Sequence, residues 1–211
     1  MTNSNSFPRS VLLLIVFALY TTAVAQQAAE PPVAKPGPTP IPAKPLVDQS
    51  VPAGWRRYEL LADPAFSVIF PATPDAAVER GEGGSVTYIY TATGANGVYV
   101  GAHFSGLGDT NDPQRQETFF NSFVKGFVQG VQETLAKSNF NFQLQLTTAK
   151  KITIPSGQKG FQQDMTLGPF TGQAQIVFIG QTGFAIVSLW TEKSPQAESE
   201  AFFNSFRVTP K

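Results

Sequence analysis

The side chains that could carry out chemistry are few, and they lie in one short part of the chain. His103 is the only histidine, and the sequence has no cysteine. A serine nucleophile needs a base within hydrogen-bond reach and a third group that orients the base. Ser105 and Asp109 are near His103 in sequence, but no G-x-S-x-G motif presents a serine. We therefore predict no catalytic residue and expect His103 to be a partly buried structural histidine.

Metal and cofactor sites are equally unexpected. Zinc needs several Cys or His ligands, and His103 is the only residue of either type. Asp109, Asn111 and Asp112 offer oxygen ligands for calcium, but their spacing lacks the complete EF-hand loop with its terminal glutamate. We expect them to serve as loop and helix-cap residues. Gly81-Glu82-Gly83-Gly84 lacks the spacing of phosphate-binding loops, so we expect it to form a flexible turn. We predict no metal and no cofactor.

Two further groups of residues leave alternatives open. Arg56 and Arg57, next to Trp55, could grip a carboxylate or stack on an aromatic partner. They could also be the solvated start of a strand with Trp55 packed beneath it. The 18 phenylalanines could fill an ordinary core or line a cavity for an apolar ligand. Most of them fall on apolar faces of the expected elements, so we favour a core.

The first 25 residues have the pattern of a signal peptide. Arg9 supplies a positive charge, an apolar run begins at Val11, and Ala23-Val24-Ala25 has the small-x-small spacing of a cleavage site. The alternative is an uncleaved membrane anchor. However, Val11 to Ala25 is shorter than the ~20 residues that span a bilayer comfortably. We predict residues 1–25 to be a signal peptide and the protein to be periplasmic or extracellular.

Residues 26–51 are rich in proline and alanine, and we predict a disordered linker there, which could be a spacer or an accessory tail. Residues 52–211 are long enough for a single domain. The net charge is +0, so the chain has no electrostatic footprint for nucleic acid and no basic cluster for an anionic lipid surface. We expect no nucleic-acid partner and no stable membrane insertion after signal cleavage.

Hydrophobic periodicity within the domain predicts strands and two helices. The longer helix begins after Asp112, a plausible N-cap, and carries apolar residues at three- and four-residue intervals. The shorter one opens at Ser194-Pro195. Asn96-Gly97 and the glycines at 180 and 183 indicate hairpins. The expected helix covers 113–137, and the expected strands cover 58–61, 66–70, 86–93, 98–105, 142–146, 151–154, 160–167, 172–179 and 184–191.

The pentapeptide Phe119-Phe120-Asn121-Ser122-Phe123 recurs unchanged at 202–206. Each copy lies in a proline-started helix that follows a strand hairpin, which favours an internal duplication over chance. The strand at 184–190 is nearly all apolar, so we expect it to be covered on both sides. We therefore predict an α+β fold, with a mostly antiparallel sheet covered by helices on both faces in a three-layer sandwich.

Three features of the sequence are Trp55, the segment 66–71 and the closing helix that ends at 202–206. Through them the sequence resembles small exported bacterial proteins of the PsbP/Mog-type superfamily, which includes PsbP-like and DcrB-like proteins. The resemblance spans most of the domain, and its motifs are packing motifs. It implies a mostly antiparallel sheet of seven or eight strands flanked by helices, in a superfamily of mainly assembly and binding proteins. No binding residue carries over.

Together these observations predict an exported, non-enzymatic binding or assembly module of the cell envelope, with another envelope protein as its partner. One alternative is a carrier of a small apolar ligand between a helix and the sheet. The other is a hydrolase that uses His103.

Overall fold

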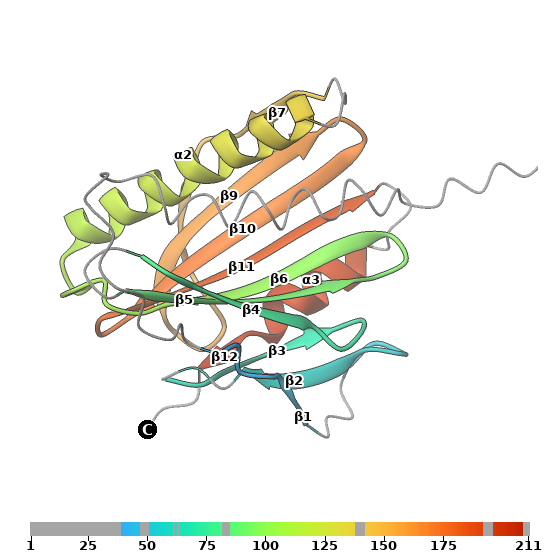
Figure 1. Ribbon diagram of the computed structural model, residues 1–211, viewed down its shortest axis with the longest axis horizontal. Helices are drawn as coiled ribbons and strands as arrows, with labels where there is room; N and C mark the ends of the chain where they lie inside the picture. Colours follow the sequence, from blue (N-terminus) through green and yellow to red (C-terminus); the bar gives the residue numbers. More distant parts are fainter. Residues whose placement is uncertain are drawn as a thin grey trace, which may run out of the picture.

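The structure is a computed structural model that describes residues 39–46, 51–60, 62, 64–81, 85–137, 142–191 and 196–208. The predicted signal peptide, residues 1–25, lies outside the described residues, as does most of the predicted linker. Every strand pair within the described ranges is antiparallel. A mostly antiparallel α+β fold is therefore confirmed (Figure 1).

The larger sheet has eight strands in the order β4-β5-β6-β11-β10-β9-β7, with β8 also paired to β9. Hairpins join β5 to β6, β9 to β10 and β10 to β11, so each pair forms between segments adjacent in sequence. The strand bounds are β4 Asp75–Arg80, β5 Val86–Thr93, β6 Gly97–Phe104, β7 Leu144–Leu146, β8 Lys150–Thr153, β9 Lys159–Leu167, β10 Phe170–Ile179 and β11 Thr182–Thr191.

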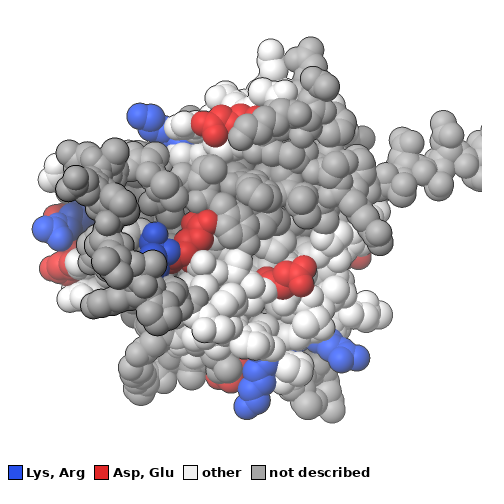
Figure 2. Space-filling model, viewed as in Figure 1, with Lys and Arg blue, Asp and Glu red and all other residues white. Residues whose placement is uncertain are grey.

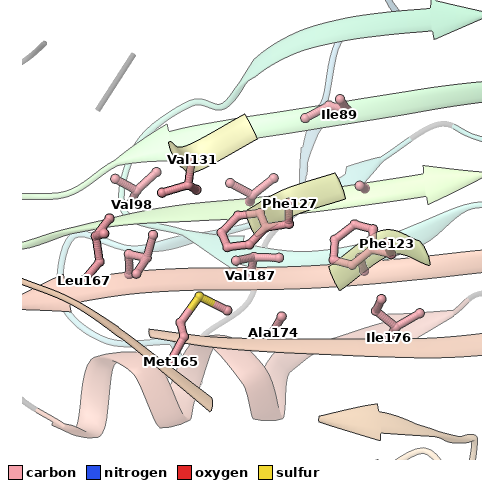
Figure 3. Packing of buried hydrophobic residues seen from close by; sticks show 14 of the residues in the cluster. Ile89, Val98, Phe123, Phe127, Val131, Met165, Leu167, Ala174, Ile176 and Val187 are labelled. Atoms are coloured by element: carbon pink, nitrogen blue, oxygen red, sulfur yellow. The ribbon is translucent and has the colours of Figure 1, made fainter. Parts of the chain in front are cut away.

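One face of the larger sheet is covered by α2 (Pro113–Lys137). The helix begins where expected, because the Asp112 carboxylate accepts a hydrogen bond from the Gln114 amide at 2.9 Å and Pro113 needs no donor partner at the first position. Figure 1 shows the helix lying along the sheet, and Figure 3 shows its Phe123, Phe127 and Val131 side chains packed with those of the strands. The buried side chains of the helix are Phe120, Phe123, Phe127, Val131 and Leu135, over Ile89, Val98, Met165, Leu167, Ala174, Ile176 and Val187.

The opposite face is covered differently from the prediction. A second, four-stranded sheet, in the order β1-β2-β3-β12, shares this side with α3 (Gln196–Ser205). Its strands are β1 Lys44–Leu46, β2 Arg56–Leu60, β3 Phe66–Phe70 and β12 Arg207–Val208. The second sheet and α3 share the aromatic packing here, with Tyr58, Phe66 and Phe70 from the sheet and Phe202 and Phe203 from the helix.

β1 lies inside the segment 26–51 that we predicted to be a linker. Lys44, Pro45 and Leu46 pair with β2, so the ordered domain begins before residue 52. Proline is tolerated there because β1 is the edge strand of its sheet. Among the described residues, no helix combines the length and the apolarity that a membrane crossing requires.

Candidate binding site

The residues considered for a hydrolase make different contacts. His103 is buried, with 1% of its surface exposed, and its ring lies 5.4 Å from that of Phe184 and 5.9 Å from that of Tyr88. The Ser105 hydroxyl donates to the Val86 carbonyl at 3.1 Å and accepts from the Val86 amide at 3.2 Å. Asp109 accepts from the backbone and side-chain nitrogens of Asn111. Each group has a structural role of its own.

The three residues considered as calcium ligands shape the start of α2. Asp109 fixes the loop through Asn111, at 2.9 Å for both hydrogen bonds. Asp112 caps the helix, and its other carboxylate oxygen lies 3.9 Å from Arg115. No cluster of three or more His, Cys, Asp or Glu side chains arranged for a metal occurs within the ranges that the structure describes.

Of the two arginines beside Trp55, Arg57 has a structural role and Arg56 is solvated. Trp55 is buried and packs edge-on against Tyr99, with ring centroids 4.8 Å apart. Arg56 is exposed, whereas Arg57 is half-buried and donates to the Ser205 carbonyl at 2.6 Å. A guanidinium at the last carbonyls of α3 satisfies an acceptor that the helix leaves open and also complements the helix dipole.

Replacing Arg57 with alanine should lower the free energy of unfolding by about 1.5–2 kcal/mol, because a charge-assisted hydrogen bond to a helix end is lost. Urea unfolding followed by circular dichroism measures the change. Arg56→Ala is the matched control and should change stability by less than about 0.5 kcal/mol, because its side chain is exposed. Equal losses in both variants would contradict the assigned role of Arg57.

Glu79 is an acidic side chain in an unfavourable environment. It lies on the edge strand β4, opposite the buried Thr87, on the face of the sheet that α2 covers. One of its carboxylate oxygens is buried and has no hydrogen-bond partner within the described part of the chain. Burial raises the pKa of Glu79 from 4.5 to about 7, because desolvation disfavours the charged form.

Glu79 should therefore make stability depend on pH. Between about pH 4.5 and 7 the folded state binds more protons than the unfolded state, so stability falls as pH rises through that window. We expect Glu79→Gln to be more stable than the parent by about 1–2 kcal/mol at pH 8, a value reduced because the carboxyl is only half-buried. The two proteins should be equally stable near pH 4. Urea midpoints between these pH values test this, and parallel pH profiles would contradict it.

A group of polar side chains occupies the sheet face opposite α2, on β8, β9 and β10. We call Lys150, Gln162, Asp164, Gln173 and Gln175 the Asp164 network. The β9–β10 register pairs Asp164 with Gln173 and Gln162 with Gln175, so all four side chains share one face. Lys150 pairs with Gln162 from β8.

Hydrogen bonds within the Asp164 network converge on the carboxylate. One oxygen of Asp164 accepts from the Gln162 amide at 2.8 Å and from the Gln173 amide at 2.9 Å, and the other accepts from the Lys150 ammonium at 3.0 Å. Gln175 donates to the side-chain oxygens of Gln162 and Gln173, each at 3.3 Å. These bonds hold five flexible side chains in one arrangement.

The electrostatics keep Asp164 ionised. Partial burial acts to raise its pKa, but hydrogen bonds from Gln173, Lys150 and Gln162, together with the Lys150 charge, outweigh burial and leave the pKa below its usual value. The stability contributed by these bonds is therefore present above the unfolded pKa of about 3.9 and lost as pH falls through the lower folded value. At neutral pH the network contains one carboxylate and one ammonium.

The Asp164 network remains accessible. Gln162, Asp164, Gln173 and Gln175 are half-buried, and Lys150 is exposed. Exposed Thr166 and Thr171 continue the same face of β9 and β10. Figure 2 shows basic and acidic side chains interspersed on the face that it presents, and no broad field of one sign gathers among the residues described there.

Sequence reasoning did not find this site, although a signal was present. Polar residues occupy every second position at 162, 164 and 166 and again at 171, 173 and 175. The tight turn at Gly168-Pro169 joins Leu167 to its partner Phe170, which fixes the register and brings the two polar rows together. Extending this reasoning from the turn along both strands would have predicted the cluster.

Comparisons with known proteins give distant structural likenesses. No protein-family model and no curated protein matches the chain. The cyanobacterial PsbP protein (CyanoP) from Synechocystis sp. PCC 6803 resembles it with a TM-score of 0.45 and 12% identity, over 78% of this chain and 98% of that one. The resemblance to PsbP-like proteins that the sequence indicated thus recurs among solved structures.

Two further solved structures show a more distant likeness. LpqN, involved in cell envelope biogenesis of Mycobacterium tuberculosis, has a TM-score of 0.34 and 15% identity, over 82% of this chain and 90% of that one. A protein of Bacteroides thetaiotaomicron VPI-5482 has a TM-score of 0.30 and 13% identity, over 69% of this chain, which spans only 46% of that one. We draw no conclusion about function from likenesses this distant.

Proposed function

We propose that this protein is an exported, non-enzymatic binding or assembly module of the cell envelope. The observation that supports it most is the Asp164 network, in which five polar side chains are held in place on an accessible sheet face. Ordered, half-exposed polar groups favour binding, because little side-chain freedom is lost when a ligand contacts them. In contrast, the His103 ring packs against Phe184, the Ser105 hydroxyl bonds to the Val86 backbone, and Asp109 bonds to Asn111.

Export is supported by the sequence of residues 1–25, with its charged start, apolar run and cleavage pattern. The proline-rich residues that follow suit a spacer between the domain and an attachment point. The partner that we propose for assembly is another envelope protein. The Asp164 network is the surface through which we expect an envelope component to be held.

Site-specific photo-cross-linking in intact cells tests the proposal on the full chain. A photoreactive residue in place of Thr171 borders the Asp164 network, and one in place of Gln132 projects from the exposed side of α2 as the matched control. We expect a defined envelope component to be captured from position 171 only, and capture to fall at least tenfold with Asp164→Ala. Equal capture from both positions, or capture that Asp164→Ala does not reduce, would overturn the proposal.

We also propose that the chain arose by internal duplication. In support, a hairpin followed by a helix occurs twice, as β5-β6-α2 and β10-β11-α3, and β6 pairs with β11 at the middle of the larger sheet. The two helices nevertheless contribute to different core clusters, on different sides of that sheet. A two-fold axis perpendicular to the sheet would place both on one side, so a duplication must have been followed by a change in how the second helix packs.

A further inference from the structure

We propose that the Asp164 network is a binding site for a neutral glycan chain of the envelope. This ligand class rests on the proposed function, because it names what the binding surface holds. Three features of the network lead to it: its charge, its unused hydrogen-bonding groups, and the position of the strands that carry it.

The charge of the network favours a neutral ligand. Asp164 and Lys150 are joined at 3.0 Å and cancel one another, and the remaining members are uncharged amides. The Asp164 carboxylate would repel an anionic chain, and the Lys150 ammonium would repel a cationic one. A neutral ligand can hydrogen-bond to both groups while the pair stays intact.

The unused hydrogen-bonding groups match hydroxyls. Each glutamine amide has two N–H donors and an ammonium has three. Within the part of the chain that the structure describes, Gln162 and Gln173 each use one N–H in the network, and Lys150 uses one. A sugar hydroxyl both donates and accepts, so it can accept from one of these donors and donate to an Asp164 oxygen.

The position of the strands disfavours an extended peptide. Peptides usually add to a sheet through main-chain hydrogen bonds at an exposed edge. β9 is paired with β10 on one side and with β7 and β8 on the other, and β10 is paired with β9 and β11. The main-chain groups beneath the network are therefore already engaged. A ligand at this site must bind through side chains, as glycans do.

An aromatic side chain borders the same face. Trp190 is half-buried and pairs with Thr171 across β10 and β11, one row beyond the pair formed by Ser188 and Gln173. An indole next to polar groups offers an apolar surface to the C–H side of a sugar ring, while the ring's hydroxyls reach the amides and the carboxylate. Exposed Thr166 and Thr171 lie in the same row as Trp190, next to the row of Asp164 and Gln173.

Titration of the full, nitrogen-15-labelled chain with neutral oligosaccharides tests this inference by NMR. Maltohexaose and fully N-acetylated chitotetraose are the probes, at concentrations up to about 10 mM, which suffices for a Kd of about 1 mM. At least one of them should shift the side-chain amide signals of Gln162, Gln173 and Gln175. Asp164→Ala should weaken that binding at least tenfold, and Gln132→Ala on α2 should leave it unchanged. If Asp164→Ala does not fold, Asp164→Asn replaces it with a side chain of the same size.

The outcomes separate the ligand class from the proposed function. Absence of shifts with both probes, or shifts that survive the change at Asp164, would overturn the glycan site. Tetra-alanine, a neutral peptide, should leave these signals unmoved, and equal shifts with it would also overturn the glycan assignment. Cross-linking from position 171 that depends on Asp164 would then still support a binding module, with another class of ligand.

Discussion

Replacing Phe202 with alanine should lower the free energy of unfolding by about 3–5 kcal/mol. The Phe202 side chain is 0% exposed, and its ring lies 5.1 Å from Tyr99, 5.3 Å from Phe203 and 5.8 Å from Phe70. It therefore joins α3 to both sheets. Truncation removes buried apolar area and leaves a cavity that three large rings cannot easily fill. Urea unfolding of the purified domain measures the loss.

The repeated pentapeptide supplies a matched control for Phe202. Phe119 occupies the same position in the first copy, and its local sequence is identical, but it is only partly buried. Phe119→Ala should therefore cost about 1–2 kcal/mol, within the usual range for a single truncation. Equal losses for the two variants would mean that the copies are packed alike, which would contradict the different surroundings assigned to α2 and α3.

Replacing Gly160 with alanine should cost about 3 kcal/mol, the upper part of the usual range for overpacking. Gly160 lies in β9 between β8 and β10, where it pairs with Ile152 and Val177. An added Cβ would collide with the main-chain carbonyl oxygen of Ile176, which cannot rotate away as a side chain could. Either β9 shifts against β10 or the variant unfolds more easily.

A second glycine separates this collision from the general effect of replacing glycine. Gly54 has a φ of 82°, but an added Cβ would meet no atom within 4 Å. Gly54→Ala should therefore cost only about 1–2 kcal/mol, from the left-handed backbone conformation alone. Thermal unfolding compares the two variants. A smaller loss of stability for Gly160→Ala than for Gly54→Ala would show that β9 is not held against β10 as described. The positions described for Gln162 and Asp164 on β9 would then also be wrong.

Elements with a strong local pattern were predictable from the sequence. The helix at Pro113–Lys137 and the strands Phe66–Phe70 and Val86–Thr93 have the bounds that the sequence indicated. In each, hydrophobic periodicity agrees with a start or stop signal, such as Asp112-Pro113 before the helix. Such signals act over a few residues, so they can be read without knowing what the element packs against.

The short edge strands β1, β4 and β12 were not predictable in the same way. β12 is two residues long, and it pairs with β3, which lies far away in the sequence. β1 contains Pro45, which is typical of a linker, and in β4, the edge strand of the larger sheet, Val78 is the only β-branched or aromatic residue. These strands form because partners with exposed edges are already in place. Tertiary context outweighs local preference there.

The candidate site contains residues whose roles follow from local sequence and residues whose roles depend on tertiary contacts. The individual roles of Asp109 and Asp112 follow from local loop and capping chemistry, which the sequence makes plain. The Asp164 network instead needs β8, β9 and β10 in register, so that Lys150, Gln162 and Gln173 reach one carboxylate. A search for catalytic motifs passes over such residues, because glutamine and a single aspartate form no reactive set.

The most direct test of a non-catalytic binding module compares two substitutions in the position-171 cross-linking experiment. His103→Gln removes the only imidazole in the sequence and should leave the cross-linking yield in intact cells unchanged, provided that thermal unfolding shows the variant to be folded. Asp164→Ala should reduce that yield at least tenfold. The account would be contradicted if folded His103→Gln lost the cross-link and Asp164→Ala retained it.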